Sequence, residues 1–538
     1  MAADDEFDVI VLGTGIAGMA AALAAAKLGM RTLLLEKAHL VGGGTTDSYG
    51  LIWVGGNHLA EAAGLPDNRD DILAYMRFVA GGESQAAKLE AYVDHSPGAL
   101  RFFEQCGVEF QLTRGVADHY MGIAPGARAE GRTVEAKLIS GYELGEWRER
   151  VRRPAMQPFF LTAEEQVSWG GMNTMHSWNQ DLVDDRRQKD MRGKGVGLIS
   201  QFLRALLAAD VPILTHVDTR SLISDGDRVA GVELADGRRI KASRGVVLAA
   251  GGYESNLGLV QTFEGMPGWT SQCPESNCGD GLVLAGEIGG AVHLIRNNLQ
   301  LFLGFEVPVE DARGGKEFHL AGIVELCSPH TMVVNRFGMR FADESYFQGM
   351  VPALRRFNVE THSHANLPCF LLFDSEYAEN YSFGGSPAGR IPQWVASSDT
   401  LEGLAARLGI DPEGLAQTAS RFADFAETGV DEDFHRGEKA WRLAKMGGNL
   451  RNPTIGPLSK APFYGIELRP TGAGSAGLLT DDRAQVLNVR GNAISGLYAT
   501  GNTAARTEFG TGYQAGFTLA SGMTFGWLAA QHMRAHRP

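Results

Sequence analysis

The sequence predicts an α/β fold in which one sheet-and-helix domain is assembled from both ends of the chain and an α+β domain is inserted between them. Three observations predict this arrangement. The first 36 residues read as strand, glycine turn, helix and strand, in that order. A buried strand within residues 245–252 runs into a glycine turn, and residues 496–502 repeat that pattern near the C-terminus. The long stretch between these units is left to form the insertion.

The first unit has each part of a nucleotide-binding βαβ fold. The apolar residues 8–12 predict a buried strand, and Gly13-Thr14-Gly15-Ile16-Ala17-Gly18 follows it directly. The alanine-rich residues 19–28 predict a helix, and the apolar residues 32–35 predict a second strand, which ends in Glu36. Strand, glycines, helix, strand and acid in this order predict a Rossmann-like dinucleotide-binding domain.

Each residue type in this unit suits a ligand that contains phosphate. Gly13 permits the tight turn, Gly15 lets the backbone approach a pyrophosphate, and Gly18 lets the helix pack closely on the strand. The start of the helix offers unpaired N–H groups and a partial positive charge. Glu36 can accept hydrogen bonds from both ribose hydroxyls, and its charge would repel a 2′-phosphate. We therefore expect a dinucleotide without that phosphate.

Later segments extend the same domain. Residues 214–217 predict a strand, and residues 229–234 and 239–241 flank an Ala-Asp-Gly turn that predicts a hairpin. A helix-compatible stretch at residues 518–532 closes the chain. We assign residues 1–290 and 461–538 to the dinucleotide-binding domain and residues 291–460 to the inserted domain.

A second glycine string, Gly472-Ala473-Gly474-Ser475-Ala476-Gly477, resembles the first one in its letters. It runs into residues 478–482, which predict a short strand and a turn instead of a helix. Because a phosphate cradle needs a helix N-terminus, we interpret this string as a loop packed near the active site. FAD is then the single expected dinucleotide, and no NAD(P)H module is predicted.

Composition narrows the function. A chain of 538 residues is long enough for two or three domains. The net charge of −14 argues against nucleic acid or an anionic membrane as a partner. Residues 1–8 are acidic and lack the basic start of an export signal, and glycines interrupt the first apolar run, so we expect no membrane span. The five cysteines form no CxxC pair, which favours free thiols, a cytoplasmic location and no metal site.

With these segments in view, the chain resembles the fumarate reductase and 3-ketosteroid dehydrogenase group of flavoproteins over nearly its whole length. The strings that carry the resemblance are Val41-Gly42-Gly43-Gly44-Thr45-Thr46, Ala250-Gly251-Gly252-Tyr253, Gly279-Asp280-Gly281 with Gly289-Gly290-Ala291, residues 335–345, Ala461-Pro462-Phe463-Tyr464 and residues 496–502. The resemblance implies that FAD lies extended across the larger domain and that the inserted domain caps the isoalloxazine ring.

The resemblance also implies which residues hold FAD. The pyrophosphate is expected at residues 15–17, the adenosine ribose at Glu36, adenine at the backbone of Val217, and the flavin N1–O2 edge at the N–H groups of residues 516–519. The full expected set is Gly13, Gly15, Ile16, Ala17, Gly18, Glu36, Lys37, Gly43, Gly44, Thr45, Thr46, Ser48, Gly50, Val217, Ala250, Gly251, Gly501, Asn502, Gly516, Thr518 and Leu519. Membrane-bound relatives link FAD to a histidine where this chain has residues 43–46, so we expect non-covalent FAD.

Two departures argue against a fumarate reductase. That branch carries a Gln-x-His-Pro-Thr string where this chain has Gln300-Leu301-Phe302-Leu303-Gly304. Its C-terminal His-Gly-Ala-x-Arg string is replaced by Gly512-Tyr513-Gln514-Ala515-Gly516. Desolvating two carboxylates needs paired cationic donors, and Arg506 stands alone nearby. These differences argue against C4 dicarboxylates as substrates.

The ketosteroid dehydrogenase branch fits better. Residues 120–126 and 130–132 resemble its Tyr-x-x-x-x-Pro-Gly and Gly-Arg strings, and Tyr346 follows Glu344 where the family has a tyrosine shortly after Asn-Glu. Residues 513–516 and 523–526 resemble its Tyr-x-x-x-Gly and Met-Thr-Phe-Gly strings. Tyr513 lies three residues before Gly516 instead of four, and Tyr346 follows the glutamate sooner than in the family.

The resemblance implies desaturation of a cyclic ketone, and the residue types suit that chemistry. The carbonyl oxygen gains negative charge as the alpha proton leaves, so Tyr513 and the Gly516 N–H are the candidate oxyanion donors. Tyr346 is the candidate base for the alpha proton, with Tyr120 as its hydrogen-bond partner. A tyrosine with a pKa of about 10 must have its pKa depressed or its proton relayed to act near neutral pH. The apolar residues 299–305 and 368–373 suit a ring better than a charged acid.

The prediction is an FAD-dependent dehydrogenase of a small apolar ketone that transfers a hydride to flavin N5 and passes electrons to an unidentified external acceptor. A 3-oxosteroid and a smaller cyclohexanone-like ring are both open. The first alternative is a fumarate reductase-type enoate reductase that binds an acid through Arg506. The second is a flavin electron-transfer protein without a substrate of its own.

Overall fold

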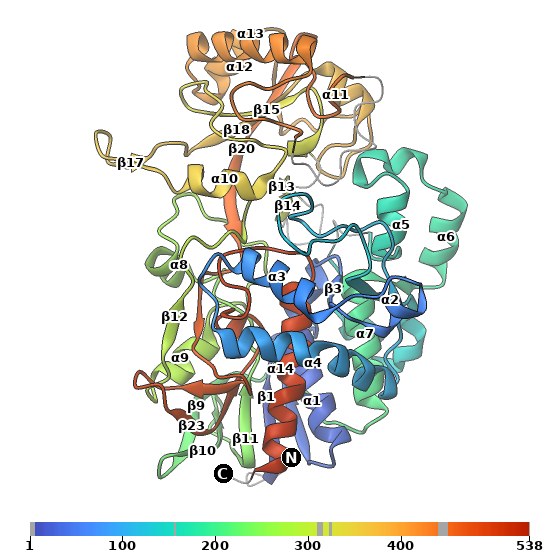
Figure 1. The fold of residues 1–538 in the computed structure, drawn as a ribbon, viewed down its shortest axis with the longest axis vertical. Helices are drawn as coiled ribbons and strands as arrows, with labels where there is room; N and C mark the ends of the chain where they lie inside the picture. The colour runs from blue at the N-terminus through green and yellow to red at the C-terminus, as the bar shows by residue number, and fades with distance from the viewer. Residues whose placement is uncertain (1–5, 155–157, 309–315, 322–324, 439–449, 537–538) are drawn as a thin grey trace.

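A computed structural model describes residues 6–154, 158–308, 316–321, 325–438 and 450–536. Figure 1 shows one sheet with its helices in the lower half and a second sheet with its own helices in the upper half. No helix within the described ranges is long and apolar enough to cross a membrane.

The larger sheet joins strands from both ends of the chain, which confirms the predicted α/β fold class. Among the described residues the strand order is β22, β23, β10, β11, β1, β2 and β8, with β9 beside β10. The bounds are β1 (Glu6–Leu12), β2 (Thr32–Leu35), β8 (Ile213–Leu214), β9 (Thr219–Asp225), β10 (Arg228–Leu234), β11 (Arg239–Leu248), β22 (Gln485–Leu487) and β23 (Ala493–Ala499). The central strands β2, β1, β11 and β23 are parallel.

β11 contains both the second strand of the predicted hairpin and the buried strand predicted after it, so the two segments form one continuous strand. At one end it pairs antiparallel with β10, so the predicted hairpin is confirmed. At the other end it pairs parallel with β1 and β23. Of the predicted strand at 214–217, only Leu214 lies in a strand, because β8 ends at Leu214 and His216 has a left-handed backbone with φ +58°.

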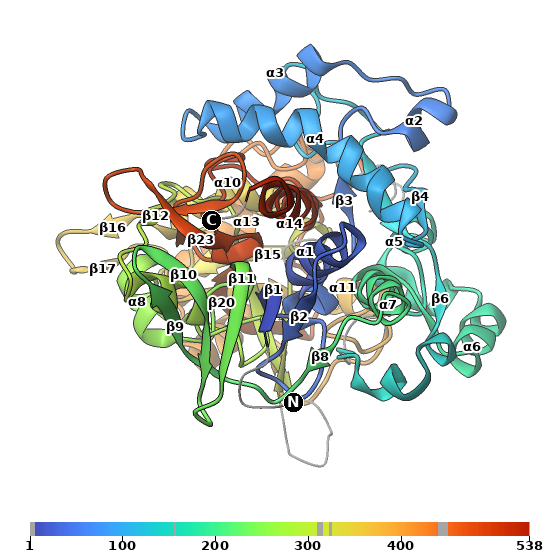
Figure 2. The ribbon, with the colours of Figure 1, turned by 90° about the horizontal axis from the view of Figure 1, so that it is seen from below.

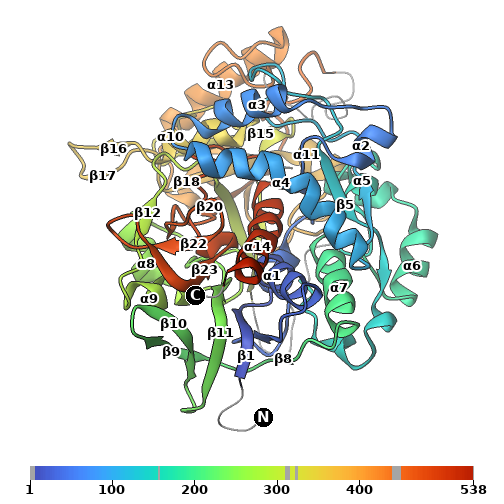
Figure 3. The ribbon, with the colours of Figure 1, turned by 60° about the horizontal axis from the view of Figure 1, so that its bottom comes forward.

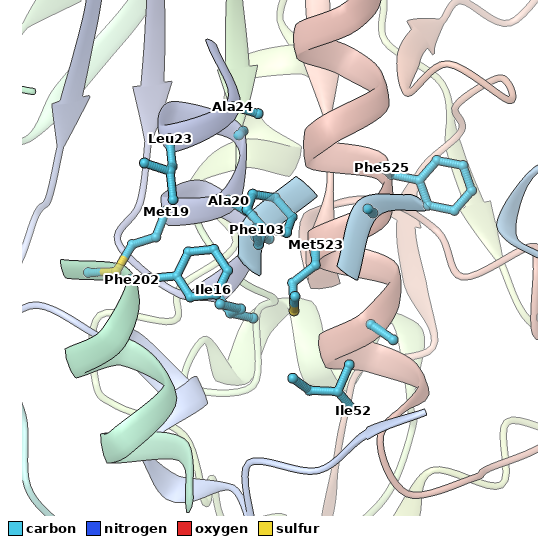
Figure 4. Packing of buried hydrophobic residues seen from close by; sticks show 14 of the residues in the cluster. Ile16, Met19, Ala20, Leu23, Ala24, Ile52, Phe103, Phe202, Met523 and Phe525 are labelled. Carbon is cyan, nitrogen blue, oxygen red and sulfur yellow. The ribbon is translucent and has the colours of Figure 1, made fainter. Parts of the chain in front are cut away.

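Helix α1 (Ile16–Lys27) is buried between the sheet and α14 (Phe517–Ala535), near the predicted bounds of both helices. Residues 16–25 are all buried, and most of them are alanine or glycine, which allows close contact between helices. A Cβ on Gly522 would lie 3.0 Å from the Cβ of Ala17. Larger side chains fill the space around this contact, as Figure 4 shows for Met19, Leu23, Phe103, Phe202, Met523 and Phe525.

Further helices cover the same side of the large sheet. Figure 2 shows α1, α14, α4 and α7 together on one side of β1 and β11. The helices in this half of the molecule are α2 (His58–Ala62), α3 (Arg69–Ala80), α4 (Ala86–Gln105), α5 (Ala163–Ser168), α6 (Gln180–Gln188), α7 (Lys194–Leu207), α8 (Leu257–Phe263) and α9 (Asp280–Gly286). Asn68, Thr162, Asn179 and Asn256 cap the starts of α3, α5, α6 and α8 through their side chains.

The second sheet is antiparallel. Its order among the described residues is β14, β13, β20, β18 and β15, with β19 beside β20. The bounds are β13 (Leu301–Pro308), β14 (Lys316–Leu320), β15 (Thr331–Asn335), β18 (Cys369–Phe373), β19 (Ala396–Ser398) and β20 (Phe463–Gly472). Its helices are α10 (Phe347–Leu354), α11 (Ser375–Asn380), α12 (Leu401–Leu408) and α13 (Pro412–Thr428). β20 belongs to this sheet, although the expected boundary between residues 460 and 461 assigns this strand to the dinucleotide-binding domain. The domain division stays a prediction.

Short strands complete the fold. They are β3 (Ile52–Trp53), β4 (Phe110–Leu112) and β5 (Thr133–Ala136) in one sheet, and the pairs β6 (Ile139–Ser140) with β7 (Met191–Arg192), β12 (Val292–Leu294) with β21 (Ala476–Leu478), and β16 (Phe357–Asn358) with β17 (Ser363–His364). Figure 3 shows the hairpin of β16 and β17 projecting from the body. The second glycine string runs from the end of β20 into strand β21, as predicted.

Candidate active site

In the glycine turn after β1, close packing requires glycine at some positions but not at all of them. Gly13 has φ +102°, and a Cβ there would lie 2.3 Å from the carbonyl oxygen of Ala249. Gly15 has an ordinary φ of −63°, and its nearest neighbour, the Thr45 Oγ1, would lie 3.5 Å from an added Cβ. Packing therefore does not require glycine at position 15. The missing side chain keeps space open over the start of α1.

That helix start is a site for an anion. Gly15 is the N-cap residue and gives no side-chain cap, which leaves backbone N–H groups facing outward. The Ile16 N–H donates to the Thr45 Oγ1 at 3.0 Å, which fixes the loop that follows β2 beside the turn. N–H groups and the positive end of the helix dipole both favour a phosphate at this place.

Glu36 lies where β2 ends and is fixed by the glycine turn. Its carboxylate accepts from the Thr14 N–H at 3.0 Å, from the Ala38 N–H at 2.9 Å and from the Thr14 hydroxyl. The side chain is buried and lines the cavity described below. A carboxylate has about four acceptor positions, so Glu36 can still accept from a ribose hydroxyl.

A single elongated cavity of about 320 Å³ runs from Glu36 to Tyr513. It is lined by most of the residues expected to hold FAD: Gly13, Gly15, Ile16, Ala17, Glu36, Lys37, Gly43, Gly44, Thr45, Ser48, Gly50, Val217, Ala250, Gly251, Gly501, Asn502, Gly516, Thr518 and Leu519. Gly18 and Thr46 lie behind this wall. A Cβ on Gly18 would meet the Gly13 oxygen at 1.9 Å, and the Thr46 hydroxyl donates to the Gly43 oxygen at 2.9 Å.

The middle and far parts of the cavity also suit FAD. The Asn502 Oδ1 lines the cavity and is buried with no hydrogen-bond partner among the described residues, so a ligand hydroxyl would satisfy it. Gly516 starts α14 with φ +95°, and a Cβ there would lie 2.5 Å from the Trp53 nitrogen. The N-terminal end of this helix faces the cavity through Thr518 and Leu519 and would stabilise negative charge on reduced flavin.

Aromatic side chains form the end of the cavity beyond Gly516. Tyr513, Phe302 and His119 line it, and Phe347 packs on all three. The ring centroids of Phe302 lie 5.2 Å from Tyr513 and 5.1 Å from Phe347, and His119 lies 5.2 Å from Tyr513. β13 supplies Phe302 and alternates its side chains, so its neighbours Leu301 and Leu303 point into the core instead. This end of the cavity therefore presents an apolar wall with one phenol and one imidazole.

The three tyrosines expected to act on the substrate lie together, but with different exposure to the cavity. Tyr513 lines the cavity, whereas Tyr120 and Tyr346 lie behind it. The Tyr120 hydroxyl accepts from the Tyr513 N–H at 3.2 Å, and the ring of Tyr120 meets the edge of Tyr346 at 6.4 Å. Their assignment as catalytic residues stays a prediction.

The expected hydrogen bond between Tyr120 and Tyr346 is not made. The Tyr120 hydroxyl is directed to the backbone of Tyr513, and the Tyr346 hydroxyl is buried without a hydrogen-bond partner in the described part of the chain. Burial raises the pKa of both phenols above the ordinary value of 10.0. Either phenol would act as a base only in its ionised form, which this burial disfavours.

Arg506, the cation on which the enoate reductase alternative depends, does not reach the cavity. It is buried, its Nη2 donates to the Gly474 oxygen at 2.8 Å, and burial lowers its pKa although Glu254 and Glu508 lie near it. It fixes the second glycine loop, whose residues Gly472 and Ala473 line the cavity. That alternative therefore loses its carboxylate-binding group.

His119 and Gln514 complete the site, and neither was among the expected residues. The Gln514 Oε1 accepts from the backbone N–H of His119 at 2.7 Å, and it also accepts from the Tyr75 hydroxyl. This amide joins the segment around Tyr120 to the segment around Tyr513. The available signal was adjacency, since each residue stands next to an expected tyrosine in the sequence.

Asp118 also fixes the segment around Tyr120. It accepts from the Trp53 Nε1 at 2.8 Å and from the Arg132 Nη1 at 2.9 Å. Arg132, which belongs to the Gly-Arg string, is itself buried and also pairs with Asp67 at 2.7 Å. The described residues hold no group of three or more His, Cys, Asp or Glu side chains that could bind a metal ion.

Comparison with known proteins agrees with this geometry. A family model described as FAD binding domain matches residues 8–521. The chain is 35% identical to a 4-oxocyclohexanecarboxylate 2-dehydrogenase of Sinomonas cyclohexanicum, over 98% of this chain and 92% of the relative. It is 32% identical to a 3-oxosteroid 1-dehydrogenase of Mycobacterium tuberculosis, over 98% of each protein.

A solved structure is similar along its whole length. The crystal structure of 3-ketosteroid delta1-dehydrogenase from Sterolibacterium denitrificans in complex with 1,4-androstadiene-3,17-dione gives a TM-score of 0.87 at 28% identity, covering 99% of this chain and 100% of that one. The resemblance inferred from the sequence is thereby confirmed, and with it FAD as the cofactor. The chain belongs to the FAD-binding flavoprotein family that contains these ketone and ketosteroid dehydrogenases.

Proposed function

We propose that this flavoenzyme desaturates a cyclic ketone, removing a proton from the alpha carbon and a hydride from the beta carbon to form an α,β-unsaturated ketone. One observation carries the proposal. The FAD cavity ends at a wall of Phe302, Tyr513 and His119, with the N-terminus of α14 beside it and no arginine among the described lining residues. FAD, when bound, accepts the hydride at its N5 atom and passes the electrons to an external acceptor.

The side chains of this wall have complementary roles. The Tyr513 hydroxyl and the Gly516 N–H would hold the carbonyl oxygen and stabilise the charge that develops on it. Phe302 and the neighbouring rings would hold the apolar body of the substrate and exclude water. Tyr346 would receive the alpha proton, with Tyr120 beside it. Because burial raises the pKa of Tyr346, we expect the rate to rise toward alkaline pH.

The relatives support a ring ketone but differ in its size. One relative is named for a 4-oxocyclohexanecarboxylate and another for a 3-oxosteroid. We propose a ring ketone as the substrate class and residues 291–460 as the domain that caps the flavin. We also propose that FAD is bound without a covalent link, because residues 43–46 offer no histidine. The described part of the chain contains no disulfide bond, which supports a reducing compartment such as the cytoplasm.

Anaerobic reduction of the bound flavin tests the proposal. The holoenzyme is mixed with 4-androstene-3,17-dione, cyclohexanone or succinate, and the yellow absorbance is followed. We expect a ketone to bleach the flavin and succinate to leave it oxidised. Bleaching by succinate alone would overturn the proposal, and bleaching by none of these compounds would favour an electron-transfer protein.

A pair of variants links that reaction to the wall. Tyr513→Phe removes the hydroxyl that would hold the carbonyl oxygen, so we expect flavin reduction to slow by about 10²- to 10³-fold. Tyr142→Phe is the matched control, because that ring is 59% exposed and lies outside the cavity. Equal rates in both variants would remove Tyr513 from the mechanism.

A further inference from the structure

Gln514 is a polar side chain of the site that ketone desaturation leaves without a role. It stands between Tyr513 and Gly516, the two proposed donors to the ketone oxygen, and its side chain is completely buried. Tyr513, Ala515 and Gly516 line the cavity, whereas Gln514 lies behind that wall. Residues 512–514 belong to no helix or strand, so the regular hydrogen bonds of an element do not hold this part of the wall.

Two donors identify the oxygen end of the Gln514 amide. The backbone N–H of His119 lies 2.7 Å from Oε1, and a backbone N–H can only donate, so this atom is the acceptor. The Tyr75 hydroxyl donates to the same oxygen. The Nε2 end is left to face the following residue, and it donates to the Ala515 oxygen at 3.4 Å.

The bond from Gln514 to Ala515 determines where the Gly516 N–H points. The peptide between Ala515 and Gly516 is planar and trans, so its C=O and N–H groups point to opposite sides. The Ala515 oxygen is turned back to Gln514, behind the wall. The Gly516 N–H is consequently directed to the cavity side, and no hydrogen bond between described residues uses this N–H.

Gly516 is also fixed on its other side. Its oxygen accepts from the Trp53 N–H at 3.2 Å, and the Trp53 indole in turn donates to Asp118 at 2.8 Å. These bonds hold the peptide that follows Gly516, while Gln514 holds the peptide that precedes it. The direction of the Gly516 N–H therefore depends on the Gln514 amide.

We propose that Gln514 is a positioning residue for ketone desaturation, which turns the Gly516 N–H toward the carbonyl oxygen as negative charge develops there. The inference rests on the proposed function for the ketone, but the direction of the N–H can be tested without turnover. A donor aimed in advance at a developing charge stabilises the transition state more than the bound substrate. Loss of the Gln514 amide should therefore slow flavin reduction and leave ketone binding nearly unchanged.

Binding of a stable oxyanion tests the direction of the N–H in the wild type. 4-Cyanophenolate carries a negative oxygen on a single ring, and 4-cyanoanisole carries a methyl group on the same oxygen. Each is titrated into the oxidised holoenzyme above the pKa of the phenol, and the shift of the flavin absorbance gives its dissociation constant. We expect the phenolate to bind at least about tenfold more tightly. Equal affinities would overturn the proposal whether or not any variant folds.

Two variants then assign the effect to Gln514. Gln514→Glu keeps an acceptor for His119 and Tyr75 but, as a carboxylate, cannot donate to Ala515, and Gln514→Leu removes the amide without adding charge. Each should slow flavin reduction at saturating ketone by about 10- to 100-fold. Each should also weaken the phenolate by about tenfold, while the dissociation constant of the ketone changes by less than about threefold.

Two controls separate positioning from packing. Tyr75→Phe removes the other side-chain bond to the amide oxygen and leaves the bonds to His119 and Ala515 in place, so we expect flavin reduction within about threefold of wild type. Gln105→Glu makes the same chemical change at an exposed residue of α4. An equal loss of rate in Tyr75→Phe and in both Gln514 variants would show that the amide serves packing, and would overturn the positioning role.

The outcomes separate the two proposals. Fast flavin reduction by ketones in both Gln514 variants would overturn the positioning role and leave the proposed function standing. Loss of FAD or of folding in both would show a structural role and would overturn it too. A phenolate preference that depends on Gln514, without flavin reduction by any ketone, would refute the proposed function and support the inferred direction of the Gly516 N–H.

Discussion

Replacing Gly15 with alanine should abolish tight FAD binding while leaving the fold intact. The backbone at Gly15 has φ −63°, and the nearest atom to an added Cβ would be the Thr45 Oγ1 at 3.5 Å. Alanine therefore fits without a clash. Its weaker capping of α1 and its smaller unfolded-state entropy oppose each other, so the free energy of unfolding should change by less than about 1 kcal/mol.

Gly15→Ala should instead weaken the binding of FAD. The new methyl group would project into the cavity at the start of α1, where the pyrophosphate is expected. Displacing the phosphate from roughly two N–H donors, each contributing about 1.5–3 kcal/mol to a charged acceptor, loses about 3–6 kcal/mol. That loss corresponds to a dissociation constant raised by about 10²- to 10⁴-fold.

The assay titrates FAD into apoprotein and follows quenching of flavin fluorescence. Gly286→Ala is the matched control, because a Cβ there meets no atom within 4 Å. Gly18→Ala provides the opposite case, since its Cβ would lie 1.9 Å from the Gly13 oxygen and should destabilise the apoprotein itself. Gly15→Ala binding FAD within about threefold of wild type would refute the reasoning. So would an apoprotein as unstable as that of Gly18→Ala.

Three further predictions concern the cluster around the tyrosines. Tyr346→Phe should lower kcat by about 10²- to 10⁴-fold with FAD content unchanged; more than about a tenth of wild-type turnover would exclude Tyr346 as the base. Burial raises the pKa of Asp343 to about 6, above the ordinary 3.8, so ionisation destabilises the fold as pH rises through this range. Asp343→Asn should therefore be more stable than wild type at about pH 7.5, by up to about 3 kcal/mol, with the difference gone near about pH 4. Denaturant unfolding at both pH values measures this, and a constant difference would contradict it. Arg132→Met leaves the buried carboxylates of Asp67 and Asp118 without that cation and should lower the unfolding free energy by about 3–5 kcal/mol. A denaturation midpoint equal to that of wild type would show that the pair is dispensable.

The βαβ unit could be predicted closely because its signals are local. Turn glycines, an alanine-rich helix and short apolar strands follow within 36 residues, and each is readable from its neighbours. The strand expected at 214–217 failed for a local reason that the letters do not show. His216 adopts a left-handed backbone. Histidine is enriched in this conformation among non-glycine residues but adopts it in only a small minority of cases, so the residue type did not predict the end of the strand.

The sequence indicated that the three tyrosines gather at the candidate site, but it did not indicate which hydrogen bonds they make. Motif resemblance placed Tyr120, Tyr346 and Tyr513 in one site, and the structure brings them together from three distant segments. Which hydroxyl bonds to which group depends on rotations that no sequence spacing encodes. His119 illustrates the limit, because its contact with Tyr513 joins residues nearly 400 positions apart. Arg506 illustrates the converse, since proximity in sequence did not bring it to the cavity.

The pairing of β13 with β20 has a consequence for how this enzyme can be altered. Leu301 pairs with Gly472 at the end of these strands, and the adjoining Gln300, Phe302 and Ala473 line the cavity. Phe302, one part of the wall proposed to meet the ketone, thus lies beside the end of the second sheet, whereas the glycine turn and Glu36, where the phosphate and ribose are expected, follow strands of the larger sheet. Mutations that change the tilt of the second sheet should therefore shift substrate preference and leave the affinity for FAD unchanged. Selectivity and cofactor retention should therefore evolve as separable traits in this protein.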